Sequence, residues 1–174
     1  MKKIMFNDKF GLTKAVLEGR KTQTRRIFAS KSTLLPDDCK SSDRYSYYKV
    51  GETVAIAQRY KDCGLTNESM KSYPAWVNKI FVKAELMPHQ IQITGIKIER
   101  LQDISEEDCL KEGIYEDGGN DSFIPHYFYN YYNSNSDGFK TPQLAYAHLI
   151  DKINGKGTWN SNLFVLVYDY KLIK

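Results

Sequence analysis

With 174 residues, the chain has the length of one folded domain and is too short for two ordinary ones. Hydrophobic residues make up 41% of it, yet no apolar run approaches the about 20 residues of a membrane helix, which excludes that class of membrane protein. The net charge of +4 permits nucleic-acid binding without requiring it.

The N-terminal segment predicts a short strand over residues 1–6, whose apolar part is too short for a signal peptide. Leu12, Ala15 and Val16 then follow helical spacing, and Gly19 suits a left-handed C-cap. A short amphipathic helix is therefore expected before Gly19.

The stretch from Gly19 to Arg26 presents a lysine, two threonine hydroxyls and three arginines, which we expect on a turn. Such a cluster can hold a phosphate or polarise a carbonyl, and a lysine beside a hydroxyl is a minimal base–nucleophile pair. The surrounding segment from Lys9 to Lys31 holds a single acidic residue, Glu18, so a solvated basic turn is the alternative.

The middle of the chain predicts a polar connection over residues 30–49 and strands over residues 53–57, 80–86 and 90–101. In the last of these strands the apolar alternation slips at Thr94-Gly95, which indicates a β-bulge.

Two further helices and a final strand are marked by their ends. Ser105 is suited to cap the first helix, whose first turn is acidic and which ends at Gly113. Thr141-Pro142 begins the second helix, which ends at Asn154-Gly155. Residues 163–170 are continuously apolar and predict a strand buried on both faces.

A long insertion loop is expected near residues 115–140, which are rich in Tyr, Asn, Ser and Gly. Its aromatic residues could stack on bases or pack the loop onto the body of the domain. They are Tyr127, Phe128, Tyr129, Tyr131 and Tyr132.

No cofactor or metal is predicted from the remaining residue types. No Gly-rich phosphate loop follows a strand, which argues against a dinucleotide cofactor. The cysteines have no CxxC spacing and favour reduced thiols in the cytoplasm, and the histidines form no metal-ligand pattern. These residues are Cys39, Cys63, Cys109, His89, His126 and His148.

The order of these motifs over nearly the whole chain resembles the ASCH family, and most closely its phage- and prophage-associated members from gut bacteria. The resemblance rests on residues 19–26, the Val50-Gly51-Glu52 turn, residues 99–105 with Glu112-Gly113, and residues 154–159 before the final strand. It implies an α+β fold of the PUA-like type, a small mixed β-barrel with short flanking helices, formed by residues 1–174 as a single domain.

The resemblance also implies a site. One branch of the family hydrolyses N4-acetylcytidine with a lysine, a threonine and a glutamate, which match Lys21, Thr24 and Glu112. Glu106, Glu107 and Asp108 are the alternatives to Glu112. The side chains expected to contact a ligand are Arg20, Thr22, Arg25, Arg26 and, at the mouth of the barrel, Tyr60.

Three functions follow as hypotheses, all with RNA or a modified nucleoside as partner. The first is an amidohydrolase that removes an N-acyl group from a modified cytosine. The second is a non-catalytic RNA or modified-base reader of a phage or mobile element, and the third is a ribonuclease. In the non-functional alternative, Lys21 and Glu112 form an ordinary salt bridge and Thr24 caps the turn.

Overall fold

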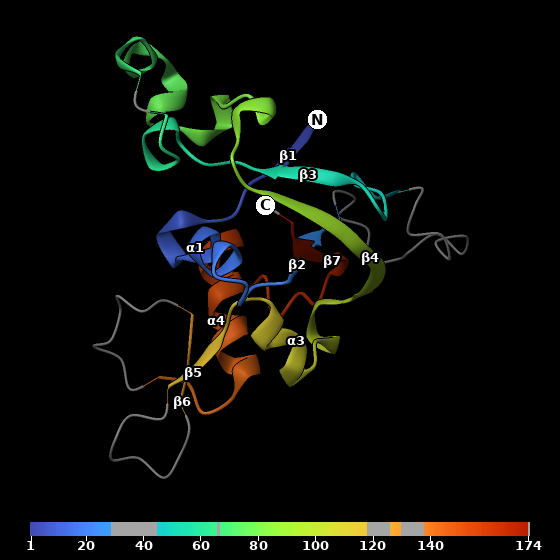
Figure 1. Ribbon diagram of the computed structural model, residues 1–174. Helices are drawn as coiled ribbons and strands as arrows, with labels where there is room; N and C mark the ends of the chain where they lie inside the picture. Colours follow the sequence, from blue (N-terminus) through green and yellow to red (C-terminus); the bar gives the residue numbers. More distant parts are fainter. Residues whose placement is uncertain (29–44, 66, 118–125, 130–137, 174) are drawn as a thin grey trace.

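The computed structural model describes residues 1–28, 45–65, 67–117, 126–129 and 138–173, and its centre is one five-stranded sheet (Figure 1). The strands lie in the order β1, β3, β4, β7, β2, with β1 parallel to β3 and every other pair antiparallel. Their bounds are β1 Lys2–Ile4, β3 Thr53–Ile56, β4 Gln90–Arg100, β7 Phe164–Leu172 and β2 Gln23–Ile27. With helices beside this sheet, the predicted α+β class is confirmed.

The long strands β4 and β7 carry the bulge that the sequence predicts. Their register shifts between Ile93 and Gly95. A side chain at Gly95 would place its Cβ 3.0 Å from the carboxylate of Asp169, and Asp169 in turn accepts a hydrogen bond of 2.7 Å from the Gln23 amide. Glycine at the bulge therefore leaves room for the Asp169 carboxylate, which is hydrogen-bonded to Gln23 of β2.

Within the described residues, the α-helices beside the sheet are α1 Leu12–Leu17, α3 Glu106–Lys111 and α4 Pro142–Asn154. The Ser105 hydroxyl accepts from the Asp108 amide at 3.1 Å, and the Thr141 hydroxyl accepts from the Leu144 amide at 3.2 Å, so both predicted N-caps are confirmed. The buried residues of α4 pack in the same hydrophobic core as the buried residues of β7. The core thus lies between the sheet and the helices.

Residues 80–86 do not form the predicted strand. They lie in two short 3₁₀-helices, Lys79–Phe81 and Ala84–Leu86, and the Asn78 side chain caps the first by accepting from the Ile80 amide at 3.0 Å. Val82 and Ala84 are buried in a second cluster, which also contains Tyr60, Ala75 and Met87, whereas Ile80, Phe81 and Leu86 are exposed. Because β4 is already paired on both sides, by β3 and β7, the sheet has no central place for another strand.

The described part of the predicted insertion forms a small antiparallel pair, β5 Tyr115–Asp117 with β6 His126–Phe128. The Tyr129 ring lies 5.7 Å from that of Phe10, and its hydroxyl lies 3.0 Å from Nδ1 of His148 on α4. Tyr129 therefore packs onto the body of the protein. Tyr131, Tyr132 and residues 30–44 of the predicted connection lie outside the described residues.

Among the described residues, no helix combines the length and the apolar character needed to cross a bilayer.

Candidate functional site

The turn after α1 positions Lys21. Gly19 adopts φ +74°, and the Lys21 amide donates to the Ala15 carbonyl at 3.0 Å while the Thr22 amide donates to the Lys111 carbonyl at 2.9 Å. The turn is therefore tied to both α1 and α3. The expected turn ends earlier than predicted, because residues from Gln23 onward pair with β7 as strand β2, which carries Thr24, Arg25 and Arg26.

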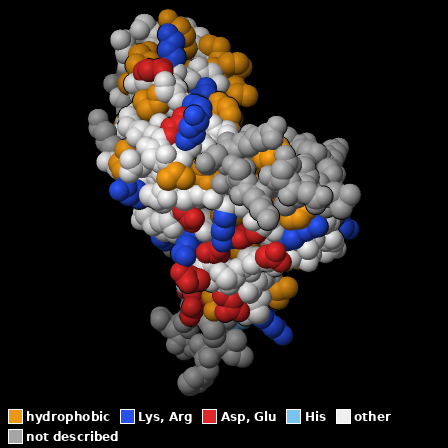
Figure 2. Space-filling view, turned by 90° about the vertical axis from the view of Figure 1, so that its right-hand side faces the viewer, with side chains coloured by type: hydrophobic (Ala, Val, Ile, Leu, Met, Phe, Trp, Pro, Cys, Tyr) orange, Lys and Arg blue, Asp and Glu red, His pale blue; other side chains and the backbone are white. Residues whose placement is uncertain are grey.

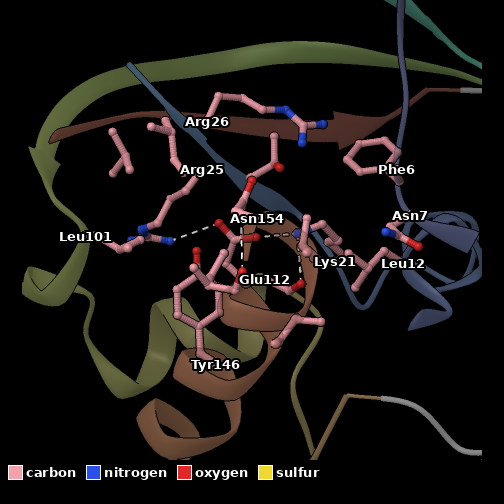
Figure 3. A pocket seen from close by; sticks show the side chains of 16 residues that line it. Phe6, Asn7, Leu12, Lys21, Arg25, Arg26, Leu101, Glu112, Tyr146 and Asn154 are labelled. Carbon is pink, nitrogen blue, oxygen red and sulfur yellow. Dashed lines mark hydrogen bonds and ion pairs between the residues drawn. The ribbon is translucent and has the colours of Figure 1, made fainter. Parts of the chain in front are cut away.

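Lys21 is buried, with 2% of its surface exposed. Its Nζ donates to the carbonyls of Gln23 and Glu112, both at 2.8 Å, and to the Glu112 carboxylate. Figure 3 shows Lys21 beside Glu112. Burial lowers the pKa of Lys21 because it disfavours the ammonium, and the Glu112 carboxylate opposes that shift. Lys21 is thus a fully hydrogen-bonded cation in an environment that favours loss of its proton.

Glu112 is the glutamate that the fold brings to Lys21. It is the C-cap of α3, and Gly113 follows with φ +99°, a conformation that bends the chain away directly after the carboxylate. The competing Glu107 pairs instead with Lys111 at 2.7 Å on the outside of the helix, where its side chain is 78% exposed. The structure therefore brings together the predicted lysine and the predicted glutamate.

Arg25 ties the site to the rest of the protein. Its guanidinium, 1% exposed, lies 2.6 Å from Glu99, 3.1 Å from Asp108 and 3.2 Å from Glu112. Burial disfavours its charge, but Glu112 and Glu99 outweigh burial and raise the pKa of Arg25. Lys97 on β4 adds contacts of 2.8 Å to Glu99 and 3.2 Å to Asp108. The forked donors of Arg25 are thus occupied by carboxylates of the protein.

A cavity of about 80 Å³ lies between β2 and α4, and Lys21, Thr24, Arg26 and Glu112 line it together with apolar residues (Figure 3). This volume has room for several water-sized groups. The apolar wall comprises Phe6, Leu12, Tyr146, Leu149, Ile150 and Ile153 among others. One side of the cavity is therefore charged and the other apolar.

Thr24 is the candidate nucleophile of this cavity. It is 3% exposed, and within the described residues no hydrogen bond of its hydroxyl is found. Arg26 is exposed and donates to the Met5 carbonyl at 2.7 Å. The cavity thus combines an unpaired hydroxyl, a buried lysine–carboxylate pair and an exposed arginine.

Three predicted ligand-binding residues lie elsewhere. Arg20 pairs with Glu18 at 2.7 Å, and Thr22 is placed by its backbone hydrogen bonds. Tyr60 is buried in the second cluster, where its hydroxyl accepts from the Lys83 amide at 3.2 Å. None of the three is among the residues that line the cavity beside Lys21.

Glu99, Asn154 and Tyr146 were not predicted from the sequence to belong to the candidate site. Glu99 lies at the edge of the Arg25 network, and Asn154 and Tyr146 line the cavity from α4. Glu99 stands on a strand with Lys97 two residues before it, and paired charges on a central strand are the signal that could have pointed to a network.

The hydroxyl of Tyr146 is buried and has no hydrogen-bond partner among the described residues. An unpaired buried hydroxyl is costly, so Tyr146→Phe should raise the free energy of unfolding by about 1 kcal/mol, measured by urea denaturation. Tyr168→Phe is the matched control, because the Tyr168 hydroxyl bonds Ser46 at 3.0 Å and the Tyr47 amide at 3.2 Å; its loss should cost about 1 kcal/mol. Equal destabilisation by both changes would contradict the assignment.

The described residues contain no group of three or more His, Cys, Asp or Glu side chains arranged to hold a metal ion.

Comparison with known proteins gives a likeness of fold. No family model and no curated protein matches the chain. A solved ASCH domain from Lactobacillus crispatus JV V101 is 13% identical, with a TM-score of 0.37, over 92% of this chain and 69% of that one. The chain resembles an ASCH domain. A DUF984 protein from Enterococcus faecalis V583 is 12% identical, with a TM-score of 0.38, over 93% of this chain and 66% of that one.

This chain spans roughly two thirds of the length of each of these two proteins, 69% and 66%. At such identity and TM-score, neither structure assigns a ligand or an activity to this chain.

Proposed function

We propose that the cavity beside Lys21 binds an N-acylated cytosine nucleoside, free or within RNA, and hydrolyses its amide bond. The observation that carries the proposal is the unpaired Thr24 hydroxyl, which lines the same cavity as the buried Lys21–Glu112 pair. A hydroxyl, a lysine whose pKa is lowered and a carboxylate form the set that acyl transfer requires.

In the proposed reaction, Thr24 Oγ attacks the acyl carbonyl carbon while neutral Lys21 takes the hydroxyl proton. The C–N bond then breaks, and the cytosine amine leaves with the proton that Lys21 took from Thr24. Water hydrolyses the remaining Thr24 ester and releases the carboxylic acid. Because Nζ of Lys21 donates to three protein oxygens, it must give up one of them to reach Thr24.

The cavity also has features that suit a nucleoside. The apolar side, with Phe6, Leu149 and Ile150, offers a surface for the flat face of a base. Arg26 is exposed beside it and carries a charge that could contact a phosphate if the nucleoside belongs to an RNA strand.

The test is to incubate the purified protein with N4-acetylcytidine and to follow the formation of cytidine and acetate by chromatography. Wild-type protein should produce both, and Lys21→Ala and Thr24→Ala should not. Turnover that survives both substitutions, or no turnover by the wild type, would overturn the catalytic proposal.

The pH dependence gives a separate expectation. Lys21 acts as a base only when it has lost its proton, so the rate should rise with pH through the pKa of Lys21. Burial lowers that pKa from its ordinary value of 10.5, so the midpoint of the rise should lie below pH 10.5. A midpoint at or above this value in the kcat–pH profile would exclude Lys21 as the base.

A non-catalytic reader is the second candidate, and one observation favours it: all three protons of the Lys21 ammonium are held by protein acceptors. Such a protein would bind single-stranded RNA without turnover, with an affinity that falls as salt rises and as Arg26 is replaced by alanine. Of the hypotheses from the sequence, the ribonuclease has no observation in its favour among the described residues. A phage origin and a cytoplasmic location remain predictions.

A further inference from the structure

A second surface lies away from the proposed site, on the lobe formed by residues 60–65 and 67–87, which stands at the top of Figure 1. Large hydrophobic side chains are exposed there between 40% and 61%: Leu86, Ile80, Tyr73, Phe81 and Val77. In Figure 2, hydrophobic side chains gather in this upper part of the molecule. Exposed apolar side chains that cluster in this way mark interaction sites.

The same lobe contains a cavity of about 210 Å³, larger than the one beside Lys21. A dry cavity of roughly 150 Å³ holds a benzene ring, so this one has room for a single large side chain. Its lining includes Tyr60, Met70, Tyr73, Pro74, Phe81 and Lys83. An aromatic-lined cavity within an apolar patch is the usual receptor for an anchor residue of a partner protein.

The charged residues of the lobe indicate which charge a binding partner should carry. Its acidic residues are all compensated: Asp62 by Arg59, Glu68 by Lys71, and Glu85 by the N-terminus of the chain. The exposed Lys61 and the exposed Lys83 at the cavity form no ion pair within 4.0 Å among the described residues, although Lys83 contributes to the lowered pKa of Glu85. Two exposed lysines that form no close ion pair with a described residue therefore lie in the same lobe as the apolar patch.

Two other occupants fit these observations less well. A second copy of the chain, paired about a two-fold axis, would bring the two apolar patches together. It would also bring Lys61 and Lys83 of both copies close to one another, and repulsion between like charges disfavours that arrangement. A nucleic acid strand would satisfy the lysines and stack on Tyr73 and Phe81. It would leave the aliphatic Val77 and Ile80, which are 61% and 52% exposed, without suitable contacts.

We infer that this lobe is a docking surface for a segment of another protein, which places one large apolar side chain in the cavity and acidic residues beside Lys83 and Lys61. Such an interface has the usual anatomy of an apolar centre and a charged rim. The inference is independent of the function proposed for the cavity beside Lys21.

The test is a selection of random peptides displayed on phage against the immobilised wild type and, in parallel, against the double variant Tyr73→Ala/Phe81→Ala. Both substituted side chains are more than half exposed, at 58% and 60%, so the variant should keep its fold, which thermal denaturation checks. The peptides enriched on the wild type should share an aromatic or leucine anchor and carry net negative charge.

The enriched peptides, synthesised and labelled, should bind the double variant at least about tenfold more weakly than the wild type. Lys83→Glu should weaken the acidic peptides by about threefold or more, whereas Leu144→Ala, an equally exposed change on α4, should leave binding unchanged. The double variant should keep the wild-type response to N4-acetylcytidine.

Three results would overturn the inference. One is the absence of enrichment on the wild type over the double variant. Another is oligouridine binding that the double variant abolishes, which would make the lobe an RNA surface. The third is a dimer in sedimentation velocity that the double variant dissociates, which would make a second copy the occupant.

Discussion

Replacing Arg25 by methionine is expected to lower the free energy of unfolding by about 3–5 kcal/mol, the largest effect on stability that we predict. The guanidinium, 1% exposed, lies within 2.6–3.2 Å of Glu99, Asp108 and Glu112. Its removal leaves these carboxylates buried or half-buried with one cation fewer between them. Urea denaturation monitored by circular dichroism measures the change.

The matched control is Arg20→Met, because Arg20 also pairs with a carboxylate but does so at the surface, where its side chain is 28% exposed and that of Glu18 is 40% exposed. Such a pair contributes roughly 0–1 kcal/mol. The double variant Arg25→Met/Glu112→Gln should be less destabilised than the sum of its single changes, since each removes the partner of the other. If Arg25→Met costs no more than Arg20→Met, the buried network does not hold the site together.

Replacing Thr24 by valine is expected to abolish turnover of N4-acetylcytidine, with a loss of at least about a thousandfold in kcat. The substitution removes the proposed nucleophile and little else. The threonine hydroxyl has no hydrogen-bond partner among the described residues, and valine is favoured on a strand such as β2. Initial-rate kinetics measure the loss, and urea denaturation should show stability within about 1 kcal/mol of the wild type.

The affinity of the variant separates this role from a structural one. Thr24→Val should bind cytidine about as well as the wild type does, because the proposed contacts of Lys21, Arg26 and the apolar wall remain. A variant that keeps its activity would show that Thr24 is not the nucleophile. A variant that loses activity and cytidine affinity in equal measure would show that Thr24 only binds.

Several parts of the fold could be predicted because the signal is local. Ser105 and Thr141 cap helices through hydrogen bonds to residues three positions later, and the slip at Gly95 is visible in the alternation of one strand. The proximity of Lys21 to Glu112 was predicted from the resemblance to the ASCH family. Spacing alone could not have shown it, since the two residues are 91 positions apart.

The parts of the fold that were predicted wrongly depend on contacts between residues that are far apart in the sequence. Residues 80–86 are rich in apolar side chains, and the sequence does not tell whether such a run pairs in a sheet or packs into a separate lobe, as it does here. Arg25 lies among polar residues and reads as a surface cation. Its burial follows from Glu99 and Asp108, 74 and 83 positions away. The pairing of β4, β7 and β2 brings Glu99 beside it, and the packing of α3 against β2 brings Asp108 there.

The most direct test of the proposed site is a nuclear magnetic resonance titration of the Thr24→Val variant with N4-acetylcytidine, because this variant should bind the nucleoside without consuming it. We expect saturable shifts of the backbone amides of residues 21–27 and of Glu112 and Gly113, which lie on or next to the charged side of the cavity. The amides of residues 60–87 should not move. Shifts confined to other parts of the molecule, or none at millimolar nucleoside, would contradict the assignment of this cavity as a nucleoside site.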